Sequence, residues 1–383
     1  MITGSKELIR DINSTLVLET IINKGSISRA NISKELGLTK TTVSSIVVKL
    51  LEKNFVLEVG SDNTKLGRKP ILLAFNANAG YVISIEIGVD KIIALQSDLL
   101  GEKIKVLERE TPNDNEGIRD VLVEIIDCIK QKAESSTYGL IGITLGIHGV
   151  IHNDQISFTP YYSLSEFDLS SFLNQRFNTK VFIENEANLS VLGELSYMPN
   201  YKNIASISVH SGVGLGLFIN GDLYTGFSGY AGEIGHTIVD VDGRDCPCGN
   251  KGCLEQYLSE KALLKEFKEA TNLDYVDFDM LSSMYKLANK DAIAIFQKFV
   301  KYMTVCINNI LNLYNPDIVI INSSFTHHFP ELTKDIEHSL NSRLNDVLHI
   351  YPSKLHHTSI LLGGVSVAVK DFLDINDLRF VSK

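Results

Sequence analysis

The sequence predicts an α/β protein preceded by a small, mainly helical domain, and three observations support this prediction. From residue 76 onward, short runs rich in Val and Ile alternate with amphipathic helical stretches, a pattern typical of α/β folds. Before residue 76, three helical stretches are followed by two short strand-like runs. The charge also changes there, because residues 1–75 hold 11 Lys and Arg against 7 Asp and Glu, a net charge of +4, whereas the remainder carries −14. We therefore expect one domain at residues 1–75 and a second at residues 76–383.

The N-terminal domain is expected to contain a helix-turn-helix. An amphipathic pattern predicts a helix over residues 5–24, and a shorter helix is predicted at residues 28–36. After the turn Gly37-Leu38, Thr39 is a suitable N-cap for a helix that runs from Lys40 to about Lys53. Two helices joined by so short a turn are typical of a helix-turn-helix.

The outward face of the later helix carries hydroxyls and cations, and its residues are Lys40, Thr41, Thr42, Ser44, Ser45 and Lys49. Such side chains can reach base edges and phosphates in the major groove of DNA. Two predicted strands, residues 55–59 and 71–75, flank a polar loop whose Arg68 and Lys69 would hold phosphates or enter a minor groove. We therefore predict a winged helix-turn-helix that binds double-stranded DNA. A small helical domain that binds protein is the alternative.

The second domain begins with alternating strands and helices. Strands are predicted at residues 81–87, 91–95, 140–146, 181–184 and 204–209, with a long helix at about 115–134. In each half, the first strand is followed directly by a second one, so antiparallel neighbours and mixed sheets are expected. Glycine-rich turns follow two of the strands, at residues 146–149 and 211–216.

One stretch, Gly232–Glu255, gathers residues that bind metals. It contains His236, Cys246, Cys248 and Cys253. Thiolates and an imidazole suit Zn²⁺, which takes four such ligands in structural sites. Glycines between the last two cysteines allow the backbone to turn tightly. Because all four positions are filled, we predict a structural zinc ion rather than a catalytic one. Reduced thiols that merely lie close together are the alternative.

The composition argues against a membrane protein and favours the cytoplasm. Hydrophobic residues make up 44% of the chain, yet no apolar run approaches the ~20 residues of a membrane span. The N-terminus lacks the apolar core of a signal peptide. The two remaining cysteines, Cys128 and Cys306, lie in helix-like apolar patterns. We expect both to be buried free thiols, which suits a reducing cytoplasm.

The metal-binding stretch also resembles the signature of the ROK family of repressors, open reading frames and sugar kinases. The family pattern is Glu-x-Gly-His followed by Cys-x-Cys-Gly-x-x-Gly-Cys-x-Glu, and it is filled here by Glu233, Gly235, His236, Cys246, Cys248, Gly249, Gly252, Cys253 and Glu255. The resemblance covers roughly residues 80–370, and residues 1–75 look like the winged head of the family's repressors. It implies a two-lobed, actin-like fold of the hexokinase type, with mixed sheets and a sugar cleft between the lobes. Lobe one is expected at about 79–186 plus the C-terminal helix, and lobe two at about 187–362.

Three stretches depart from the pattern of the family's kinases. The kinase phosphate loop, Asp-x-Gly-Gly-Thr-Lys, corresponds to residues 86–91, where Val89 replaces a glycine and Asp90 replaces the threonine. A bulky side chain and a carboxylate at these positions would oppose the binding of a triphosphate. Asn322-Ser323-Ser324 replaces a run of glycines, and Glu186 stands where the kinases have an aspartate as general base. We therefore expect no enzymatic activity. A ROK-family sugar kinase with a DNA-binding head is the alternative.

The resemblance also implies which residues contact a sugar, namely Asn185, Glu186, Glu233, His236 and Glu255. Their carboxylate, amide and imidazole groups can hold sugar hydroxyls in fixed geometry. His236 would bind zinc through one ring nitrogen and donate to the sugar through the other. For Glu233 and Glu255, support of the metal ligands is the alternative. His148 is expected either to be solvated or to reach the cleft, and Tyr161-Tyr162 either to line the cleft or to pack in the core.

These expectations combine into a sugar-responsive transcriptional repressor that binds a palindromic operator as a homodimer and is released by a free monosaccharide. Head and body together look most like the xylose repressors of Gram-positive bacteria. This resemblance implies D-xylose as the inducer and glucose as a competitor for the same cleft. Control by a phosphosugar or by a partner protein is a third possibility. The apolar face of residues 301–313 would suit either a dimer contact or a core helix.

Overall fold

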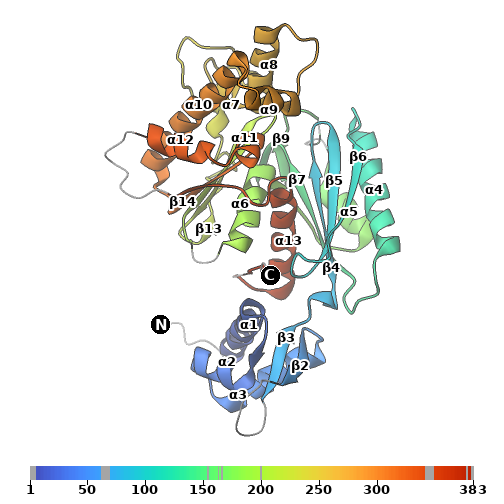
Figure 1. Ribbon diagram of the computed structural model, residues 1–383. Coiled ribbons are helices and arrows are strands. Elements are labelled where there is room, and N and C mark those ends of the chain that lie inside the picture. The colour runs from blue at the N-terminus through green and yellow to red at the C-terminus, as the bar shows by residue number, and fades with distance from the viewer. Residues whose placement is uncertain are drawn as a thin grey trace.

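The structure is a computed structural model of the chain, and it describes residues 6–61, 70–152, 155–162, 164, 167–198, 201–340, 349–376 and 378–380. A small head, the described part of residues 6–75, lies beside a larger body that begins at residue 76 (Figure 1). The body contains two five-stranded sheets, and the helices α6 (Glu186–Tyr197) and α13 (Thr358–Leu373) lie between them. The predicted class, an α/β protein with a winged helix-turn-helix head, is confirmed.

The head contains three helices and a small antiparallel sheet. Its elements are α1 (Lys6–Lys24), β1 (Ile27–Ser28), α2 (Arg29–Leu36), α3 (Lys40–Glu52), β2 (Val56–Ser61) and β3 (Ile71–Phe75), and the strands pair in the order β1-β3-β2. Both helices of the motif are capped by a hydroxyl, because Ser28 accepts from the N–H of Asn31 and Thr39 from the N–H of Thr42. Gly37 ends α2 in the left-handed backbone region, with a φ of 65°. These local signals explain why α2 and α3 lie where the sequence predicts them.

The first body sheet is mixed and has the strand order β10-β7-β4-β5-β6. Its strands are β4 (Tyr81–Ile87), β5 (Lys91–Asp98), β6 (Lys105–Glu110), β7 (Leu140–Ile147) and β10 (Val181–Asn185). β4, β7 and β10 run parallel, whereas β5 pairs antiparallel with β4 and β6. The accompanying elements are η1 (Ala77–Ala79), α4 (Asn115–Lys132), the hairpin β8 (Val150–His152) and β9 (Gln155–Phe158), and α5 (Leu169–Phe177).

The second body sheet repeats this plan, with the strand order β13-β12-β11-β14-β15. Its strands are β11 (Ile204–Val209), β12 (Val213–Ile219), β13 (Asp222–Leu223), β14 (Ile318–Ser323) and β15 (Ile350–Pro352). β11 pairs antiparallel with β12 and parallel with β14. The accompanying helices are η3 (Ile234–His236), α7 (Glu255–Leu258), α8 (Glu260–Thr271), α9 (Phe278–Lys286), α10 (Lys290–Tyr314), α11 (Ser324–His328) and α12 (Leu332–Ser339).

The helices α6 and α13 cross at very close range. A Cβ atom on Gly363 would lie 1.9 Å from the carbonyl oxygen of Leu189, and one on Gly193 would lie 2.1 Å from that of Ser359. Only glycine fits at such a backbone approach. On its other side, α13 contacts β4 and β7, where Thr144 donates to the carbonyl oxygen of Gly364 over 2.8 Å. α13 therefore connects the centre of the body to the first sheet.

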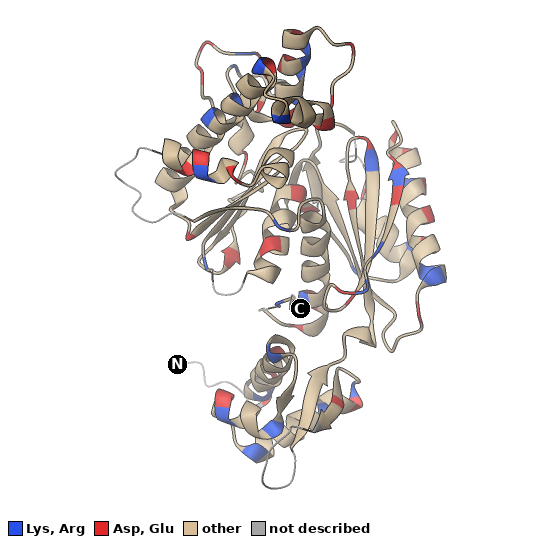
Figure 2. Cartoon of the chain, viewed as in Figure 1, with Lys and Arg blue, Asp and Glu red and all other residues tan. Residues whose placement is uncertain are grey.

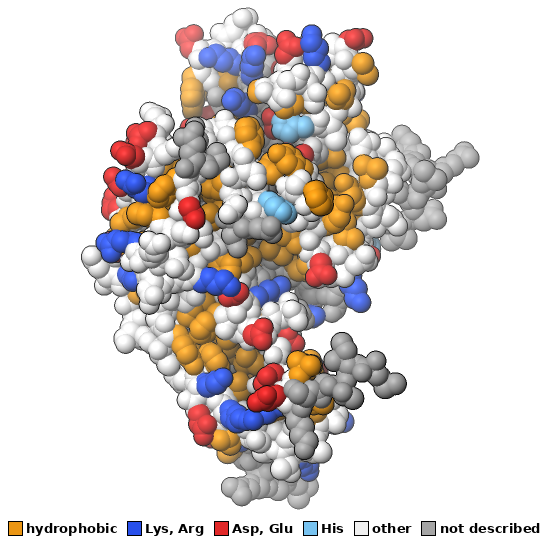
Figure 3. Space-filling model, turned by 180° about the vertical axis from the view of Figure 1, so that it is seen from behind, with side chains coloured by type: hydrophobic (Ala, Val, Ile, Leu, Met, Phe, Trp, Pro, Cys, Tyr) orange, Lys and Arg blue, Asp and Glu red, His pale blue; other side chains and the backbone are white. Residues whose placement is uncertain are grey.

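The head is packed on the body rather than tethered to it. One buried hydrophobic cluster contains residues of both parts, among them Val17, Leu18, Ile22 and Phe75 of the head and Leu373, Ile375, Leu378 and Phe380 of the body. Phe55 stacks on Tyr138 with ring centroids 5.0 Å apart, and Phe372 lies edge-on to both rings. The N–H of Asn376, just after α13, donates to Glu19 of α1 over 3.0 Å. Seen from behind, hydrophobic side chains form a visible patch just above the head (Figure 3).

The apolar face of residues 301–313 belongs to the core. Within α10, the side chains of Met303, Cys306, Ile307, Ile310 and Leu311 are buried in the cluster beneath the second sheet. Cys306 is thus a buried thiol as expected, and its burial raises its pKa to about 12. Cys128 on α4 differs from the expectation, because it lies on the edge of the helix's buried face and is only partly buried.

Charged groups are distributed unevenly over the surface. Figure 2 shows Lys and Arg positions on α3, at the end of the molecule farthest from the two body sheets, whereas both signs are scattered over the body. Among the helices that the structure describes, none is both long and apolar enough to cross a membrane.

Candidate functional site

Four potential metal ligands lie together next to η3 and α7. His236 ends η3, Cys246 and Cys248 lie in the following loop, and Cys253 lies two residues before α7. One ligand atom from each of the four residues lies within 4.8 Å of the other three. The loop depends on Gly252, where φ is 70° and a Cβ atom would lie 1.6 Å from the carbonyl oxygen of Asp240. The spacing that predicted a metal site therefore does bring these side chains together.

The donor set suits zinc. Sγ of Cys246 lies 3.7 Å from Nδ1 of His236, and the Sγ atoms of Cys248 and Cys253 are 3.6 Å apart, too far for a disulfide bond. A backbone N–H from Asn250 lowers the pKa of Cys248 to about 7, which favours the thiolate that metals bind. Burial raises the pKa of Cys253 to about 12, so a nearby cation would be needed to deprotonate it near neutral pH.

The two ring nitrogens of His236 face different neighbours. Nδ1 is directed at the thiols, whereas Nε2 lies 3.9 Å from Oε2 of Glu233. His236 and Glu233 both line a small cavity of about 120 Å³. The same cavity is lined by all five residues expected to contact a sugar, namely Asn185, Glu186, Glu233, His236 and Glu255. The structure thus brings together residues from β10, α6, η3 and α7.

Asn185 has a supporting position in this cavity. Its Oδ1 accepts from the N–H groups of Ala187 and Asn188 at the start of α6, and its Nδ2 donates to the carbonyl oxygen of Gly149 over 2.8 Å. These bonds use most of its hydrogen-bonding capacity. Asn185 therefore holds the loop at residue 149 against the start of α6, and less of it remains to contact a ligand.

Glu255 is also anchored by the fold, and it begins α7. Its Oε2 accepts from the N–H of Val213 over 3.2 Å. A Cβ atom on Gly212 would lie 2.8 Å from the same oxygen, so glycine allows the glycine-rich turn to approach the carboxylate. Burial raises the pKa of Glu233, which lies across the cavity. Both carboxylates are only partly buried, and both line the cavity.

Glu186 forms an ion pair with His148, a residue for which the sequence left two possibilities open. Nδ1 of His148 lies 3.2 Å from Oε1 of Glu186, and the two side chains are only 18% and 15% exposed. Burial alone would lower the pKa of His148, but the carboxylates of Glu186 and Glu86 raise it to about 9. His148 is therefore a charged residue of the cleft and not a solvated one.

The strand register explains this pair. Ile147 at the end of β7 lies opposite Asn185 at the end of the parallel strand β10. The next residue of each strand, His148 and Glu186, must then lie side by side. Oε2 of Glu186 is buried, and it has no hydrogen-bond partner among the described residues.

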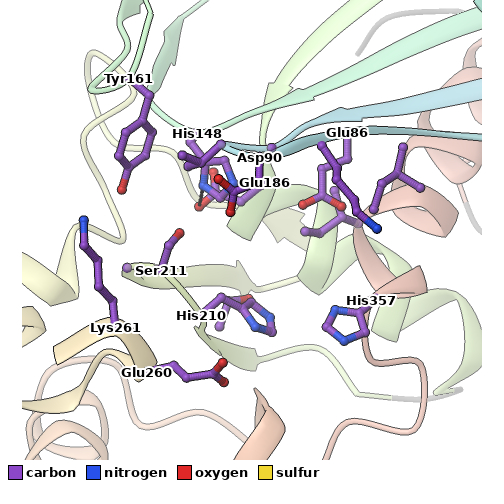
Figure 4. Close-up of a pocket in the computed structure, with 18 of the residues that line it drawn as sticks. Glu86, Asp90, His148, Tyr161, Glu186, His210, Ser211, Glu260, Lys261 and His357 are labelled. Carbon is purple, nitrogen blue, oxygen red and sulfur yellow. Dashed lines mark ion pairs between the residues drawn. The ribbon is translucent and has the colours of Figure 1, made fainter. Parts of the chain in front are cut away.

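A second, larger cavity of about 730 Å³ adjoins the first (Figure 4). Glu86, Asp90, His148 and Tyr161 enter it from the first sheet and its loops, while His210, Ser211, Glu260, Lys261 and His357 enter it from the opposite side. Burial raises the pKa of Glu86 to about 7 and lowers that of His210 to about 4. Tyr161 lines both cavities, whereas Tyr162 packs against the first-sheet core and donates to the carbonyl oxygen of Ile87.

The backbone and the lysine of the loop at residues 86–91 already have partners within the protein. The N–H of Gly88 donates to the carbonyl oxygen of Lys91 over 2.9 Å, and a Cβ atom on Gly88 would lie 2.7 Å from that oxygen. The ammonium group of Lys91 pairs with Glu108 over 2.9 Å. Val89 and Asp90 line the large cavity. Asn322 belongs to the stretch that stands where the family's kinases have a run of glycines. Its side-chain amide donates to the hydroxyl of Ser359 and to the carbonyl oxygen of His356.

The predicted DNA-binding residues of α3 lie on one side of that helix. Lys40, Thr41, Ser44, Ser45 and Lys49 are exposed, and Thr42 is partly buried. The opposite side, formed by Val43, Ile46, Val47 and Leu50, is buried in the head. The predicted wing residues Arg68 and Lys69 lie outside the described residues.

Models of known protein families match both the head and the body of the chain. A family model for winged helix-turn-helix DNA-binding segments matches residues 10–56, and the ROK family model matches residues 82–370. The chain belongs to the ROK family. The resemblance carried by residues 233–255 is thereby confirmed, and so is the winged helix-turn-helix.

Several named transcriptional regulators are similar over almost the whole chain. The xylose repressor of Bacillus spizizenii is 37% identical, covering 97% of this chain and 98% of its own length. The xylose repressor of Staphylococcus xylosus is 32% identical, covering 96% and 97% of the two chains. The regulator NagC of Escherichia coli is 25% identical, covering 94% and 92%.

Solved structures support the fold. A ROK family transcriptional regulator, described as a homologue of the E. coli MLC protein, superposes with a TM-score of 0.82 at 22% identity and covers 96% of this chain and 97% of its own. A ROK glucokinase from Streptomyces griseus, in complex with glucose and AMPPNP, superposes with a TM-score of 0.68 at 22% identity. It covers 99% of its own chain but only 75% of this one.

The ROK signature did not indicate every residue of the two cavities. Ser208, His210 and Glu260 line the large cavity, and no motif marked them. Two of them could have been found from the strand pattern, because Ser208 lies near the end of β11 and His210 directly follows it. In open α/β sheets, the residues at the carboxyl ends of strands face the ligand crevice.

Proposed function

We propose that this ROK family protein is a sugar-responsive transcriptional repressor of the reducing cytoplasm. A dimer would bind a palindromic operator through its two heads, and a free monosaccharide in the small cavity would release it. The observation that carries this proposal is the pairing, in one chain, of a helix with an exposed hydroxyl and cation face and a cavity lined by convergent carboxylates and an imidazole.

The small cavity suits a sugar because its groups match what hydroxyls offer. Oε2 of Glu186 is a buried acceptor without a partner among the described residues, and Glu233 and Glu255 add further carboxylates. Nε2 of His236 can donate to a ligand oxygen. D-Xylose is our first choice of inducer, because relatives up to 37% identical are named xylose repressors. Glucose would compete for the same cavity.

A structural zinc ion would be held by His236, Cys246, Cys248 and Cys253. When bound, the ion neutralises the thiolates and ties the loop to η3 and α7. Binding through Nδ1 leaves the proton of His236 on Nε2, the nitrogen that lies 3.9 Å from Oε2 of the cavity residue Glu233. The metal would therefore both fix the shape of the sugar site and set the tautomer of one of its donors.

We propose that the protein has no kinase activity. Glu86, Asp90 and Glu260 give the large cavity three carboxylates besides that of Glu186. The carboxylates would repel a triphosphate. A sugar kinase with a DNA-binding head is the second candidate, because a ROK glucokinase has the same body fold. A coupled ATPase assay with a panel of sugars separates the two, and turnover near ~1 s⁻¹ would favour the kinase.

Dimer formation is supported by the exposed side of α1. Leu8, Ile9, Ile12 and Leu16 are 49%, 54%, 50% and 39% exposed, respectively, in the single chain. Their spacing places them on one apolar stripe, which a second copy could cover. Sedimentation of the protein and of an Ile9→Asp, Ile12→Asp double variant would show whether this stripe holds the dimer together.

Isothermal titration calorimetry on the full chain tests the proposed inducer. D-Xylose, D-glucose, N-acetylglucosamine and a pentose phosphate are titrated separately. We expect a saturable signal with D-xylose, weaker or competing binding of glucose, and no signal with the phosphorylated sugar. If only the phosphorylated sugar binds, control by a phosphosugar replaces this proposal, and if no sugar binds, control by a partner protein does.

A further inference from the structure

We propose that the large cavity is a second subsite for a neutral polyhydroxylated group, so that the protein can bind a sugar unit beyond the one in the small cavity. This inference rests on the proposed function, in which the small cavity holds a monosaccharide. It goes further by assigning a ligand class to the space next to it. The second unit is either linked to the first, as in a disaccharide, or is a separate sugar molecule.

The two cavities are direct neighbours. They share the lining residues His148, Tyr161, Glu186, Gly212 and Gly214. The larger part has a volume of about 730 Å³, against about 120 Å³ for the smaller. A sugar in the small cavity that contacts Glu186 therefore borders open space on the far side of that carboxylate. A group linked to such a sugar would reach the large cavity past the shared side chains of His148, Tyr161 and Glu186.

Unpartnered polar atoms mark the large cavity as a place for hydroxyl groups. Ser208, Glu260 and Glu186 line it, and each has one buried polar atom (Oγ of Ser208, Oε2 of each glutamate) without a hydrogen-bond partner among the described residues. The Ser208 side chain belongs to a residue that is only 4% exposed. Leaving buried polar atoms unpaired is unfavourable. Hydroxyl groups satisfy such a set, because they donate to carboxylates and also accept from a serine.

The charges in the cavity select against anions. Glu86, Asp90 and Glu260 all line it, and Lys91 is already paired with Glu108. His210 is held neutral by burial, which lowers its pKa to about 4. Two cations remain in this group of side chains, namely Lys261 on α8 and His148, and His148 is paired with Glu186 (Figure 4). The balance opposes phosphate groups and leaves neutral hydroxylated ligands as the class that fits.

Tyr161 lies where the two cavities meet. It is 42% exposed, and its ring is edge-on to that of His148 at a centroid distance of 6.1 Å. An exposed aromatic face beside carboxylates suits a sugar ring, which has apolar C–H faces and polar edges. The junction is thus built to accept a sugar on either side.

Calorimetry with the full-length protein tests the subsite, using D-xylose and β-1,4-xylobiose as probes. Ser208→Ala removes the unpartnered hydroxyl, and Glu260→Gln replaces the carboxylate by a neutral amide of the same size. Glu269→Gln, on the exposed side of the same helix α8, is the matched control. We expect either one xylobiose per chain or two molecules of xylose per chain. Both variants should weaken binding at the second subsite about three- to tenfold. The affinity for the first xylose should stay within about twofold, because neither residue lines the small cavity.

These measurements distinguish failure of the second subsite from failure of the proposed sugar-responsive function. Binding of a single xylose with no binding of xylobiose would overturn the second subsite and leave the proposed inducer intact. Equal weakening of xylose and xylobiose in both variants would also overturn it, because the residues would then act on the whole cleft. Tight binding of AMPPNP to the wild-type protein would show that the cavity takes anions instead. If neither sugar binds the wild-type protein, the proposed function itself fails.

Discussion

His236 occupies the position where metal binding and ligand binding meet. Its Nδ1 faces the thiols, and its Nε2 lies 3.9 Å from Oε2 of Glu233, which lines the small cavity together with His236. The orientation of one imidazole would thus depend on the metal and affect the ligand. The backbone supports this arrangement, because η3 ends at His236 and the hydroxyl of Thr237 donates back to the carbonyl oxygen of Ile234. We infer that the metal site and the cavity are lost or retained together.

Substitution of one metal ligand tests this dependence. Cys248→Ser should lose the bound zinc and, with it, the sugar affinity, because the loop and the His236 tautomer are then no longer held. Zinc content by atomic absorption and sugar affinity by calorimetry are measured on the same sample. Cys128→Ser, in a partly buried thiol on α4 outside the cluster, is the control. Unchanged sugar binding in a metal-free Cys248→Ser protein would refute the idea that the metal supports the cavity.

The ion pair between His148 and Glu186 should make stability depend on pH. The pKa of His148 is raised to about 9 in the folded protein, from an ordinary 6.5. A raised pKa means that this contribution is fully present below pH 6.5 and is lost as the pH rises through about 9. Glu86 and Glu186 are the carboxylates that raise it.

His148→Gln should therefore lower the free energy of unfolding by about 1–3 kcal/mol near pH 6. The difference from wild type should shrink toward zero by about pH 10. Urea unfolding at a series of pH values measures it, with His338→Gln at an exposed position of α12 as the control. A difference that does not change with pH would mean that the His148 ring contributes through packing and not through charge.

At the scale of single elements, α3 has a buried side and a polar side that serve different purposes. Val43 and Val47 fix the helix in the head, while Lys40 and Lys49 are exposed on the other side. A lysine that contacts a phosphate releases a counterion on binding, so its loss changes the salt dependence of affinity and not only the affinity.

Lys40→Ala should weaken operator binding and reduce the slope of log K against log salt concentration by about 1. Sugar affinity should not change, because Lys40 lies in the head, far along the chain from both cavities. Gel-shift titrations at several salt concentrations measure the slope. Lys265→Ala, at an exposed position of α8, is the control. Joint loss of DNA and sugar binding would show that the DNA-binding face has been misplaced.

Elements governed by local signals were predicted well from the sequence. Ser28 and Thr39 cap their helices as hydroxyl N-caps should, and the four metal ligands lie within one short stretch. Short elements such as β6, the β8–β9 hairpin and β13 were not predicted, because two to six residues carry too little periodicity. The pair of His148 with Glu186 depends on the register of β7 against β10, which a single sequence does not reveal. The five sugar-site residues came from the family motif and not from periodicity.

At the scale of the whole molecule, the structure offers a physical connection between the cavities and the head. His357, at the N-terminal end of α13, lines the large cavity, and the residues after its C-terminal end pack on α1. The aromatic group of Phe55, Tyr138 and Phe372 reinforces this junction. A change in the distance between the two sheets would be passed to the head through α13, provided that the junction is rigid.

Phe372→Ala should weaken that connection. We expect operator affinity and sugar affinity to stay within about threefold, while the sugar causes less release of the operator, because coupling and binding are separate free energies. Fluorescence anisotropy of labelled operator measures release, and Phe227→Ala, at a side chain that is 99% exposed, is the control. Full release in the Phe372→Ala protein would show that the signal does not pass through this junction.

In the proposed function, sugar binding in the cavity releases the protein from operator DNA. The most direct test of this release is a titration of the preformed protein–operator complex with D-xylose, without nucleotide. Operator occupancy is followed by fluorescence anisotropy. We expect saturable release by D-xylose, opposition by glucose, and no effect of adding ATP. An operator that stays bound at every sugar concentration, or release that requires ATP and yields a phosphorylated sugar, would contradict this function.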